Sequence, residues 1–510
     1  MKPRLKPQDS GTQELFRAKL RNIINLEHEL VRLGELIDWQ RLEMHFAPYY
    51  REAGRPGLAI RLVVGLHLLK HIEGLSDEAV CERWERDPYM QYFCGEEYFQ
   101  HAFPLERSGM THFRKRVGDE ALETLLQETL AAAYRGGALS LRATEAVAVD
   151  TTVQEKAIAH PTEHGLLLTG IEQLGRQGKK AGLRLRQSYV RVARKAAMKT
   201  GRYLHAQQKR RAKRQVKFLR VRLRRLIRDV RRKMAALPAL AESSVQRLEH
   251  TLGRAWHIAQ QQRGDRDYVY SWHAPETECI SKGKARAPYE FGCKVSIVTN
   301  LHPAKGGHFI LQARALHGNP YDGHTLKQAL DDVREMVGRS PLRVAVDQGY
   351  KGHRLTGHPH TAVYITGQRR GVTDKIKRWL KRRAVVEPVI GHAKNDGLLG
   401  RNWLQGRAGD RCNAVLAAAG FNLRQLLRFL RSIPYFLRDL FCAMLVTLRP
   451  ATTRAVYIHI QNDFLTADFL TARLGNLTHF LSELKLDAEV CVTTGRRLRQ
   501  QKRRSDRRPA

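Results

Sequence analysis

The sequence predicts an α/β protein in which helices cover a mixed β-sheet. Three observations lead to this fold class. Short apolar runs typical of buried strands occur from residue 145 onward, amphipathic helical patterns lie among them, and the region before them is helical in pattern. The predicted order, three strands, a helix, two strands and a helix, suits a single mixed sheet with helices on its faces.

The region before the first strand is predicted to be a helical N-terminal domain. Leu62, Leu66 and Leu69 recur at helical spacing, and Ser76 is a typical first residue for a helix that follows Gly74.

Farther on, the stretch SGMTHFRKRVG predicts a short helix whose exposed side carries Arg114 and Arg116. A solvated face would explain these arginines, but in so basic a chain we expect them to contact a DNA duplex.

Five strands are expected after this domain. They are EAVAVD at 145–150, YEFGCKVSIVTN at 289–300, GHFILQARAL at 307–316, LRVAVD at 342–347 and TAVYITG at 361–367. Between the third and fourth strands, TLKQALDDVREMVG predicts a helix with Leu326, Leu330 and Val333 on one face.

A long basic insertion separates the first strand from the second. From Arg176 to Lys233 it contains 24 Lys or Arg residues and one acid, Asp229. Apolar residues recur every three or four positions over 216–234 and again over 245–255. The two segments therefore predict an antiparallel helical hairpin that buries its apolar seams.

The balance of charge predicts a polyanionic partner. The 510 residues include 89 Lys or Arg and 50 Asp or Glu, a formal charge of +39, which would repel itself unless nucleic acid or counterions neutralised it. A charge run is often only a solvated face, but the apolar stripe favours ordered helices whose arginines, including Arg210, Arg211 and Arg214, contact phosphates. No apolar run is long enough to cross a membrane and no secretory signal begins the chain. We therefore expect a cytoplasmic, nucleoid-associated protein with no membrane partner.

Two acids end predicted strands, Asp150 in VAVDTT and Asp347 in VAVDQGYKG. Each alone could simply cap a turn. On neighbouring strands, however, they would bring two like charges to one edge of the sheet, which is costly unless a divalent cation neutralises them.

Glu387, on the helix after the last strand, is the natural third acid, and three carboxylates without a His/Cys set favour Mg²⁺ or Mn²⁺. Two such ions about 3.5–4 Å apart clamp the attacking and leaving oxygens of a displacement at phosphorus. The three acids therefore predict cleavage or transfer of a phosphodiester.

The residues around Glu387 add a second pattern. Arg383, Glu387 and Lys394 have the spacing of one helix face, although an ordinary Arg–Glu pair explains the first interval equally well. Pro388 leaves two alternatives: it begins the helix with Glu387 as the cap, or it kinks a continuous helix. The relation of Glu387 to Lys394 holds in either case.

On these residues the chain resembles the DDE transposases of bacterial insertion sequences, particularly the insertion-sequence-five family. The resemblance covers about residues 40–430, through GRPGLAIRLVVGLHLLKHIEGLSDEAV, SGMTHFRKRVG, VDTTVQEKAI, YSWHAPETECISKGKARAPYEFGCKVSI, VDQGYKG and KRRAVVEPVIGHAKNDG. It implies an RNase H-like catalytic domain in which Asp150, Asp347 and Glu387 form the DDE triad and bind two Mg²⁺ (or Mn²⁺) ions.

The family's glutamate motif is Tyr, two residues, Arg, three residues, Glu, six residues, Lys. The chain matches it at Arg383, Glu387 and Lys394 but has Leu380 at the tyrosine position. The resemblance implies that the two basic residues contact element-end DNA or the active-site phosphates. It further implies a homodimer on double-stranded DNA that binds terminal inverted repeats, cleaves them with metal ions and transfers the strands to a target.

These observations divide the chain into five parts. They are a helical N-terminal DNA-binding domain (1–138), the first part of the RNase H-like catalytic domain (139–175), the basic helical-hairpin insertion (176–265), the remainder of the catalytic domain (266–432) and a C-terminal tail without an assigned role (433–510). The tail resembles a disordered basic end, as expected if the reading frame has run past its usual stop. Two alternative functions remain open: an RNase H-like nuclease without strand transfer, and an inactive basic DNA-binding protein.

Overall fold

The computed structural model describes residues 18–50, 57–104, 106, 108–236, 242–281, 288–368 and 371–447, with the backbone alone from 433 onward. The chain divides into two units, Met1–Ser432 and Ile433–Ala510. The sheet and all the residues discussed below belong to the first unit. Beyond the backbone of its final helix, the predicted tail at 433–510 lies outside the described residues.

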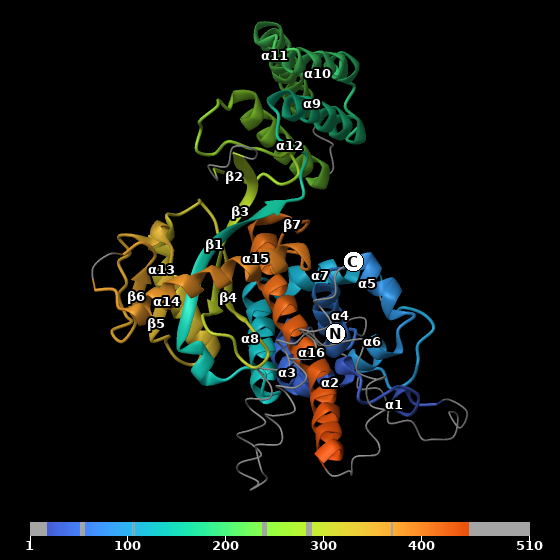
Figure 1. Ribbon diagram of the computed structural model, residues 1–510. Coiled ribbons are helices and arrows are strands. Elements are labelled where there is room, and N and C mark those ends of the chain that lie inside the picture. The colour runs from blue at the N-terminus through green and yellow to red at the C-terminus, as the bar shows by residue number, and fades with distance from the viewer. Residues whose placement is uncertain are drawn as a thin grey trace, which may run out of the picture. The chain divides into compact units, whose positions relative to one another are not determined.

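A mixed sheet of seven strands positions two of the predicted catalytic residues, Asp150 and Asp347 (Figure 1). The strands are β1 (Ala146–Lys156), β2 (Glu278–Ser281), β3 (Tyr289–Asn300), β4 (Ile310–Leu316), β5 (Arg343–Val346), β6 (Ala362–Ile365) and β7 (Arg401–Asn402). Their order is β2-β3-β1-β5-β6, and β4 also pairs with β3 and β7 with β1. The five expected strands are confirmed, whereas β2 and β7 are too short to give a periodic signal.

Strand direction changes at β1. This strand pairs antiparallel with β3 and parallel with β5, while β5 pairs parallel with β6 and β3 antiparallel with β4. The V-A-V runs of β1 and β5 lie side by side, with Val147 opposite Val344 and Ala148 opposite Ala345. These residues are buried, as continuous apolar runs are in sheets that helices cover on both faces.

The N-terminal region is helical, as predicted. Its helices are α1 (Leu20–Ile23), α2 (Glu29–Leu36), α3 (Trp39–Phe46), α4 (Ile60–Glu73), α5 (Asp77–Trp84), α6 (Pro88–Phe93), α7 (Ser108–Val117) and α8 (Glu120–Arg135), with the 3₁₀ turns η1 (Ala47–Tyr49) and η2 (Leu141–Thr144). Gly74 ends α4 in the left-handed conformation, and Ser76 caps α5 by accepting a hydrogen bond from the Ala79 N–H.

The helix α16 (Gly406–Thr447) joins the N-terminal helices to the sheet. Its Ala414, Ala417 and Phe421 pack in one apolar cluster with strands β3 and β4. A Cβ added at Gly420 would stand only 2.4 Å from the His71 carbonyl oxygen of α4, so glycine permits this close crossing of α16 and α4. Of the helices that the structure describes, none is long and apolar enough to cross a membrane.

The basic region between β1 and β2 forms four packed helices. They are α9 (Glu163–Lys180), α10 (Val190–His205), α11 (Lys209–Ala235) and α12 (Glu242–Gln260). The apolar stripe of α11 is buried, as expected, and so is that of α12. The predicted two-helix hairpin was incomplete, because Leu167, Ile171 and Leu174 of α9 and three alanines of α10 enter the same core.

The helices near Glu387 resolve the Pro388 question. Helix α13 (Asp322–Val337) follows β4, η3 (Gln348–Tyr350) follows β5, and α14 (Asp374–Arg382), η4 (Arg383–Val385) and α15 (Val386–Asn395) follow β6. Pro388 is the third residue of α15, within the first turn, where its missing N–H leaves no bond unmade. The 3₁₀ turn η4 interrupts the α-helix about one turn before Pro388, so the alternative in which Pro388 begins the helix with Glu387 as its cap is wrong.

Candidate active site

Asp150 and Asp347 lie side by side on the sheet. The register of β1 and β5 places Ala148 opposite Ala345, and each aspartate comes two residues later. Asp150 lies within β1 and Asp347 directly follows β5, where its carboxylate accepts a 2.8 Å hydrogen bond from the Gly349 N–H. The two acids thus occupy adjacent positions on neighbouring parallel strands, as expected.

The surroundings of Asp150 favour a bound cation. Its side chain is only 18% exposed, and Oδ2 lies 3.3 Å from Arg383 Nη1. Burial raises the pKa of Asp150 and the nearby Asp347 and Asp322 raise it further, whereas the Thr151 N–H and Arg383 oppose the rise. The negative form is therefore costly in the isolated protein and would be stabilised by positive charge.

Arg383 bridges the first and third predicted acids. Its Nη2 donates to Glu387 Oε1 at 3.0 Å while Nη1 lies by Asp150, and the guanidinium side chain is 13% exposed. Glu387 is 65% exposed on α15. The start of α15 is fixed by buried Val386, which packs with Ala148 and Ala345 of β1 and β5.

Lys394 lies two turns after Glu387 on α15 and is half-buried. Leu380, at the family's tyrosine position, is half-buried near the end of α14. The structure therefore brings Arg383 into direct contact with both Asp150 and Glu387, while Asp347 lies beside Asp150 at the end of the neighbouring strand.

The sequence-based prediction missed a fourth acid at this edge. Asp322, the first residue of α13, accepts hydrogen bonds at 3.1 Å from both Thr151 Oγ1 and Lys294 Nζ. A first-turn acid is common in helices, so its position alone gave no functional signal. Thr151 lies on β1 and Lys294 on the neighbouring β3, and only the folded structure shows that both donate hydrogen bonds to Asp322.

Arg114 corrects another prediction. It is not on the exposed face of α7 but buried, with its side chain 7% exposed and Nη2 2.5 Å from Asp77 Oδ2. Burial alone would raise the pKa of Asp77, but Arg114 and Lys70 together lower it. Arg114 therefore braces α5 against α7, and its neighbour Arg116 is the exposed arginine.

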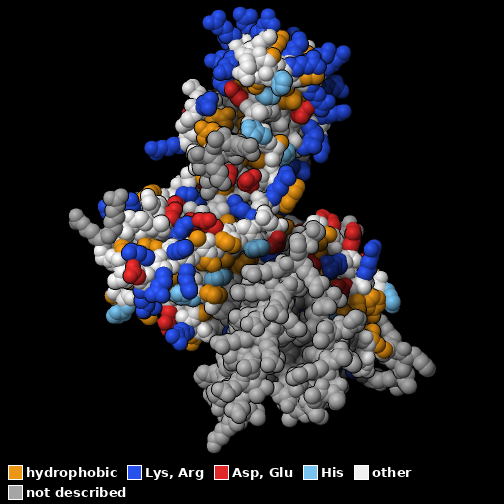
Figure 2. All heavy atoms as spheres, viewed as in Figure 1, with side chains coloured by type: hydrophobic (Ala, Val, Ile, Leu, Met, Phe, Trp, Pro, Cys, Tyr) orange, Lys and Arg blue, Asp and Glu red, His pale blue; other side chains and the backbone are white. Residues whose placement is uncertain are grey.

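The predicted phosphate-contacting residues of the insertion are on its surface. Arg210, Arg211 and Arg214 near the start of α11 are all exposed. Figure 2 shows Lys and Arg side chains gathered over the region where Figure 1 labels α10 and α11. The apolar core of the four helices holds this basic surface in an ordered form.

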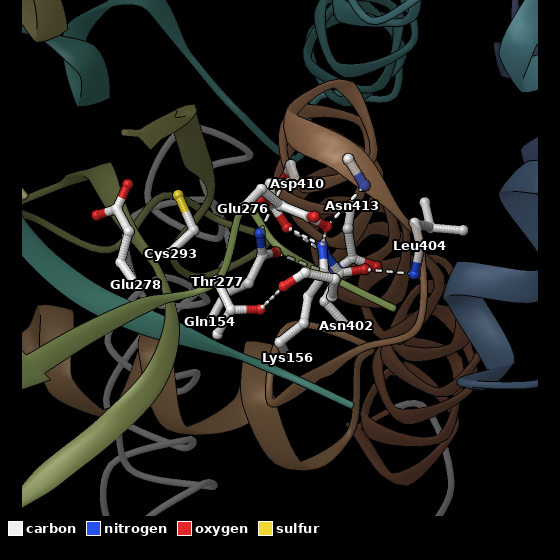
Figure 3. Close-up of polar contacts among 12 residues, drawn as sticks. Gln154, Lys156, Glu276, Thr277, Glu278, Cys293, Asn402, Leu404, Asp410 and Asn413 are labelled. Atoms are coloured by element: carbon white, nitrogen blue, oxygen red, sulfur yellow. Dashed lines mark hydrogen bonds and ion pairs between the residues drawn. The ribbon is translucent and has the colours of Figure 1, made fainter. Parts of the chain in front are cut away.

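A second group of polar residues lies at the far end of β1 (Figure 3). Lys156 Nζ forms ion pairs with Asp410 Oδ1 at 2.7 Å and Glu276 Oε1 at 2.8 Å, and all three side chains are buried. Asn402 Nδ2 also donates to Asp410 Oδ1 at 2.7 Å. These contacts join β1, β7, α16 and the segment before β2.

Beside this network, Cys293, His317 and Asp410 place one ligand atom each within 4.8 Å of one another. The Cys293 thiol lies 3.4–3.5 Å from two main-chain carbonyls, and Asp410 already takes Lys156 and Asn402. Burial raises the pKa of Cys293, which keeps it a thiol. Because Asp410 is already ion-paired and Cys293 stays a thiol, this group is better explained as a structural brace than as a metal centre.

Comparison with known proteins identifies the class. The family model described as Transposase domain (DUF772) matches residues 18–116, the helical region from α1 into α7. This match supports a transposase of the insertion-sequence type. The chain is 51% identical over 199 residues to the uncharacterized protein ORF8 in the nfe locus of Rhizobium meliloti, an alignment that covers 39% of this chain and 96% of that protein, and it belongs to the same family. No solved structure matches the chain.

Proposed function

We propose that this transposase is an RNase H-like DDE enzyme of the insertion-sequence-five type, which binds the terminal inverted repeats of its element, cleaves them and transfers the strands to target DNA. The observation that carries the proposal is the placement of Asp150 and Asp347 on adjacent parallel strands, with Arg383 linking Asp150 to Glu387. The order β4-β3-β1-β5-β6, antiparallel on one side of β1 and parallel on the other, supports the fold assignment.

The donor chemistry of this edge fits Mg²⁺ or Mn²⁺. Asp150, Asp347 and Glu387 offer carboxylate oxygens alone, which hard divalent cations prefer, and Asp150 lies where burial and neighbouring acids make a cation favourable. Two ions bound there would supply Lewis-acid activation of water and stabilise the attacking and leaving oxygens.

The protein's own groups would orient the DNA. Arg383 is within reach of both Asp150 and Glu387, so a phosphate that entered this edge would meet a guanidinium suited to bidentate contact. Lys394, on the same helix as Glu387, would offset charge that develops on the phosphate. Asp150 and Asp347, fixed by the sheet, would hold the ions in place while the scissile bond is exchanged.

We assign the contacts with DNA beyond the cleavage site, both at the element ends and in the target, to the exposed arginines of α7 and α11. Arg116 and the set Arg210, Arg211 and Arg214 are exposed, whereas buried Arg114 is excluded from this surface. Changing Arg210, Arg211 and Arg214 together to Gln should weaken binding to end DNA. Because each lost phosphate contact removes about 0.9 from the slope of log K against log salt, the salt dependence should also decrease, and an unchanged slope would exclude this surface.

Cleavage and strand transfer of a labelled end duplex test the proposal. The wild-type chain with Mg²⁺ should nick the end and join it to a second duplex, while Asp150→Ala and Asp347→Ala should bind the end without cutting it. Cleavage without joining would favour the nuclease alternative. Binding without metal-dependent cleavage by the wild type would favour an inactive DNA-binding protein, and full activity in either variant would refute the proposed site.

A further inference from the structure

Asp322 occupies a place on the acidic edge that the proposed triad does not use. Its Oδ1 accepts hydrogen bonds at 3.1 Å from Thr151 Oγ1 and from Lys294 Nζ. Thr151 follows Asp150 directly on β1, so the start of α13 is tied to the strand that carries the first acid. The pairing fixes Asp322 by one oxygen and orients the other.

The second oxygen of Asp322 lies near Asp347. A Cβ added at Gly349 would stand 3.0 Å from Asp347 Oδ1 and 3.1 Å from Asp322 Oδ2. Both oxygens therefore border the same glycine. A side chain at this position would have to push one carboxylate aside, and Gly349 lets the main chain approach both.

Tyr350, near these acids, is a second observation that points to a bound group at this edge. Its side chain is fully buried and its hydroxyl has no hydrogen-bond partner of good geometry among the described residues, although Thr325 lies near enough to lower the pKa of Tyr350. Burial raises the pKa of Tyr350, and Asp322, Asp150 and Asp347 raise it further. A buried hydroxyl without a well-formed hydrogen bond is costly unless ordered water or a bound group completes it.

The described basic residues at this edge form ion pairs with only two of the three aspartates. Arg383 pairs with Asp150 and Lys294 with Asp322. Among the residues that the structure describes, no Lys or Arg forms an ion pair with Asp347. Glu387, by contrast, is mostly exposed and already held by Arg383.

We propose that Asp322 is a fourth carboxylate of the metal site and that, before DNA binds, one divalent ion is held by Asp150, Asp347 and Asp322 without the need for Glu387. The inference rests on the proposed function, because it assumes that this edge binds a divalent cation. It adds Asp322 of α13 as a ligand. It also divides the site into two parts: the three aspartates hold this ion, whereas Glu387 and Arg383 are not needed for it.

The test is titration of the full chain, free of DNA, with Mn²⁺, followed by the loss of the electron paramagnetic resonance signal of the free ion. Asp322→Asn should lower Mn²⁺ affinity at least about tenfold, since even outer partners of metal ligands contribute 10–100-fold. Glu387→Gln should bind like the wild type. Glu335→Gln, which removes one exposed charge from the same helix α13, is the matched control and should also bind like the wild type.

The outcomes separate this inference from the function on which it rests. If Asp322→Asn binds Mn²⁺ like the wild type while Asp150→Asn does not, the fourth ligand is wrong and the active site stands. If Glu387→Gln loses as much affinity as Asp322→Asn, the division of the site is wrong. Should neither the wild type nor any variant bind Mn²⁺, the proposed active site itself fails. Asp322→Ser, which keeps an acceptor for Thr151 and Lys294, replaces the Asn variant if that variant unfolds.

Discussion

Strand β1 carries two charged groups of different character. Around Asp150, near the middle of the strand, carboxylates from β1, β5 and α13 come together and Asp347 has no described basic partner in an ion pair. Around Lys156, at the end of the strand, one ammonium group is shared by two buried carboxylates and an amide completes the network. At the first group one acid lacks an ion pair within the described part of the chain, which suits a site that binds a ligand, whereas at the second every charged group has an ion-pair partner, which suits a structural joint.

The largest expected effect is on catalysis at the first group. Asp347→Asn should lower end cleavage by more than about 100-fold, the scale of losing one group that stabilises developing charge, and should leave DNA binding and thermal unfolding near wild type. A gel-based cleavage assay beside calorimetry checks both parts. If Asp347→Asn is partly unfolded and its cleavage falls only in proportion to the folded fraction, the loss comes from stability and not from catalysis. That result would contradict the placement of Asp347 in the active site.

At the second group the expected effect is on stability. Lys156→Met should lower the free energy of unfolding by about 3–5 kcal/mol, because it leaves buried Asp410 and Glu276 without their cation. Urea unfolding measures the loss. Replacing both partners in Lys156→Met/Asp410→Leu should recover part of it, and a loss below about 0.5 kcal/mol for the single variant would show that the network is not a structural joint.

Two nearby arginines of α7 show the same difference between a structural and a functional charge, with smaller expected effects. Arg114→Gln should lower the free energy of unfolding by a few kcal/mol, since it breaks a buried pair with Asp77. Arg116→Gln should leave stability nearly unchanged and weaken DNA binding instead, because Arg116 is exposed. Urea unfolding and a fluorescence anisotropy titration with end DNA compare the two, and equal effects on stability would contradict the assignment.

The smallest effect concerns the pH dependence of Asp150. Burial raises its pKa in the folded protein, so the folded state loses stability as the pH rises from the unfolded pKa through that raised value. Asp150→Asn should therefore be more stable than the wild type at neutral pH. The gain should shrink as the pH falls and vanish below the unfolded pKa of about 3.9, where both forms are neutral. Urea unfolding at pH 7 and pH 4 without metal tests the sign, and a destabilised variant at pH 7 would reverse it.

Much of the fold could be predicted from sequence because the long elements carry regular apolar patterns. The strands with Asp150 and Asp347 share V-A-V, and the register of β1 and β5 confirms that the two acids lie side by side. The short β2 and β7 gave no pattern, and most of α9 falls before residue 176, where the insertion was predicted to begin.

The parts of the site that escaped prediction depend on tertiary contacts. Asp322 reads as an ordinary first-turn acid until Thr151 and Lys294 are seen to meet it. Arg114 and Arg116 are two residues apart in a basic run, and only packing against Asp77 separates the buried one from the exposed one. The 3₁₀ turn η4 directly precedes α15 and leaves Pro388 in the first turn of that helix, where its missing N–H is tolerated.

The central claim is that the divalent cation binds at the aspartate edge of β1 and not at its Lys156 end. Fe²⁺ loaded in place of Mg²⁺, with ascorbate and peroxide, cuts the main chain close to the bound ion, and mass spectrometry locates the cuts. We expect fragments that end near Asp150, Asp322 and Asp347, and their loss in Asp150→Asn. Cuts near Cys293, His317 and Asp410, unaffected by that change, would contradict the account.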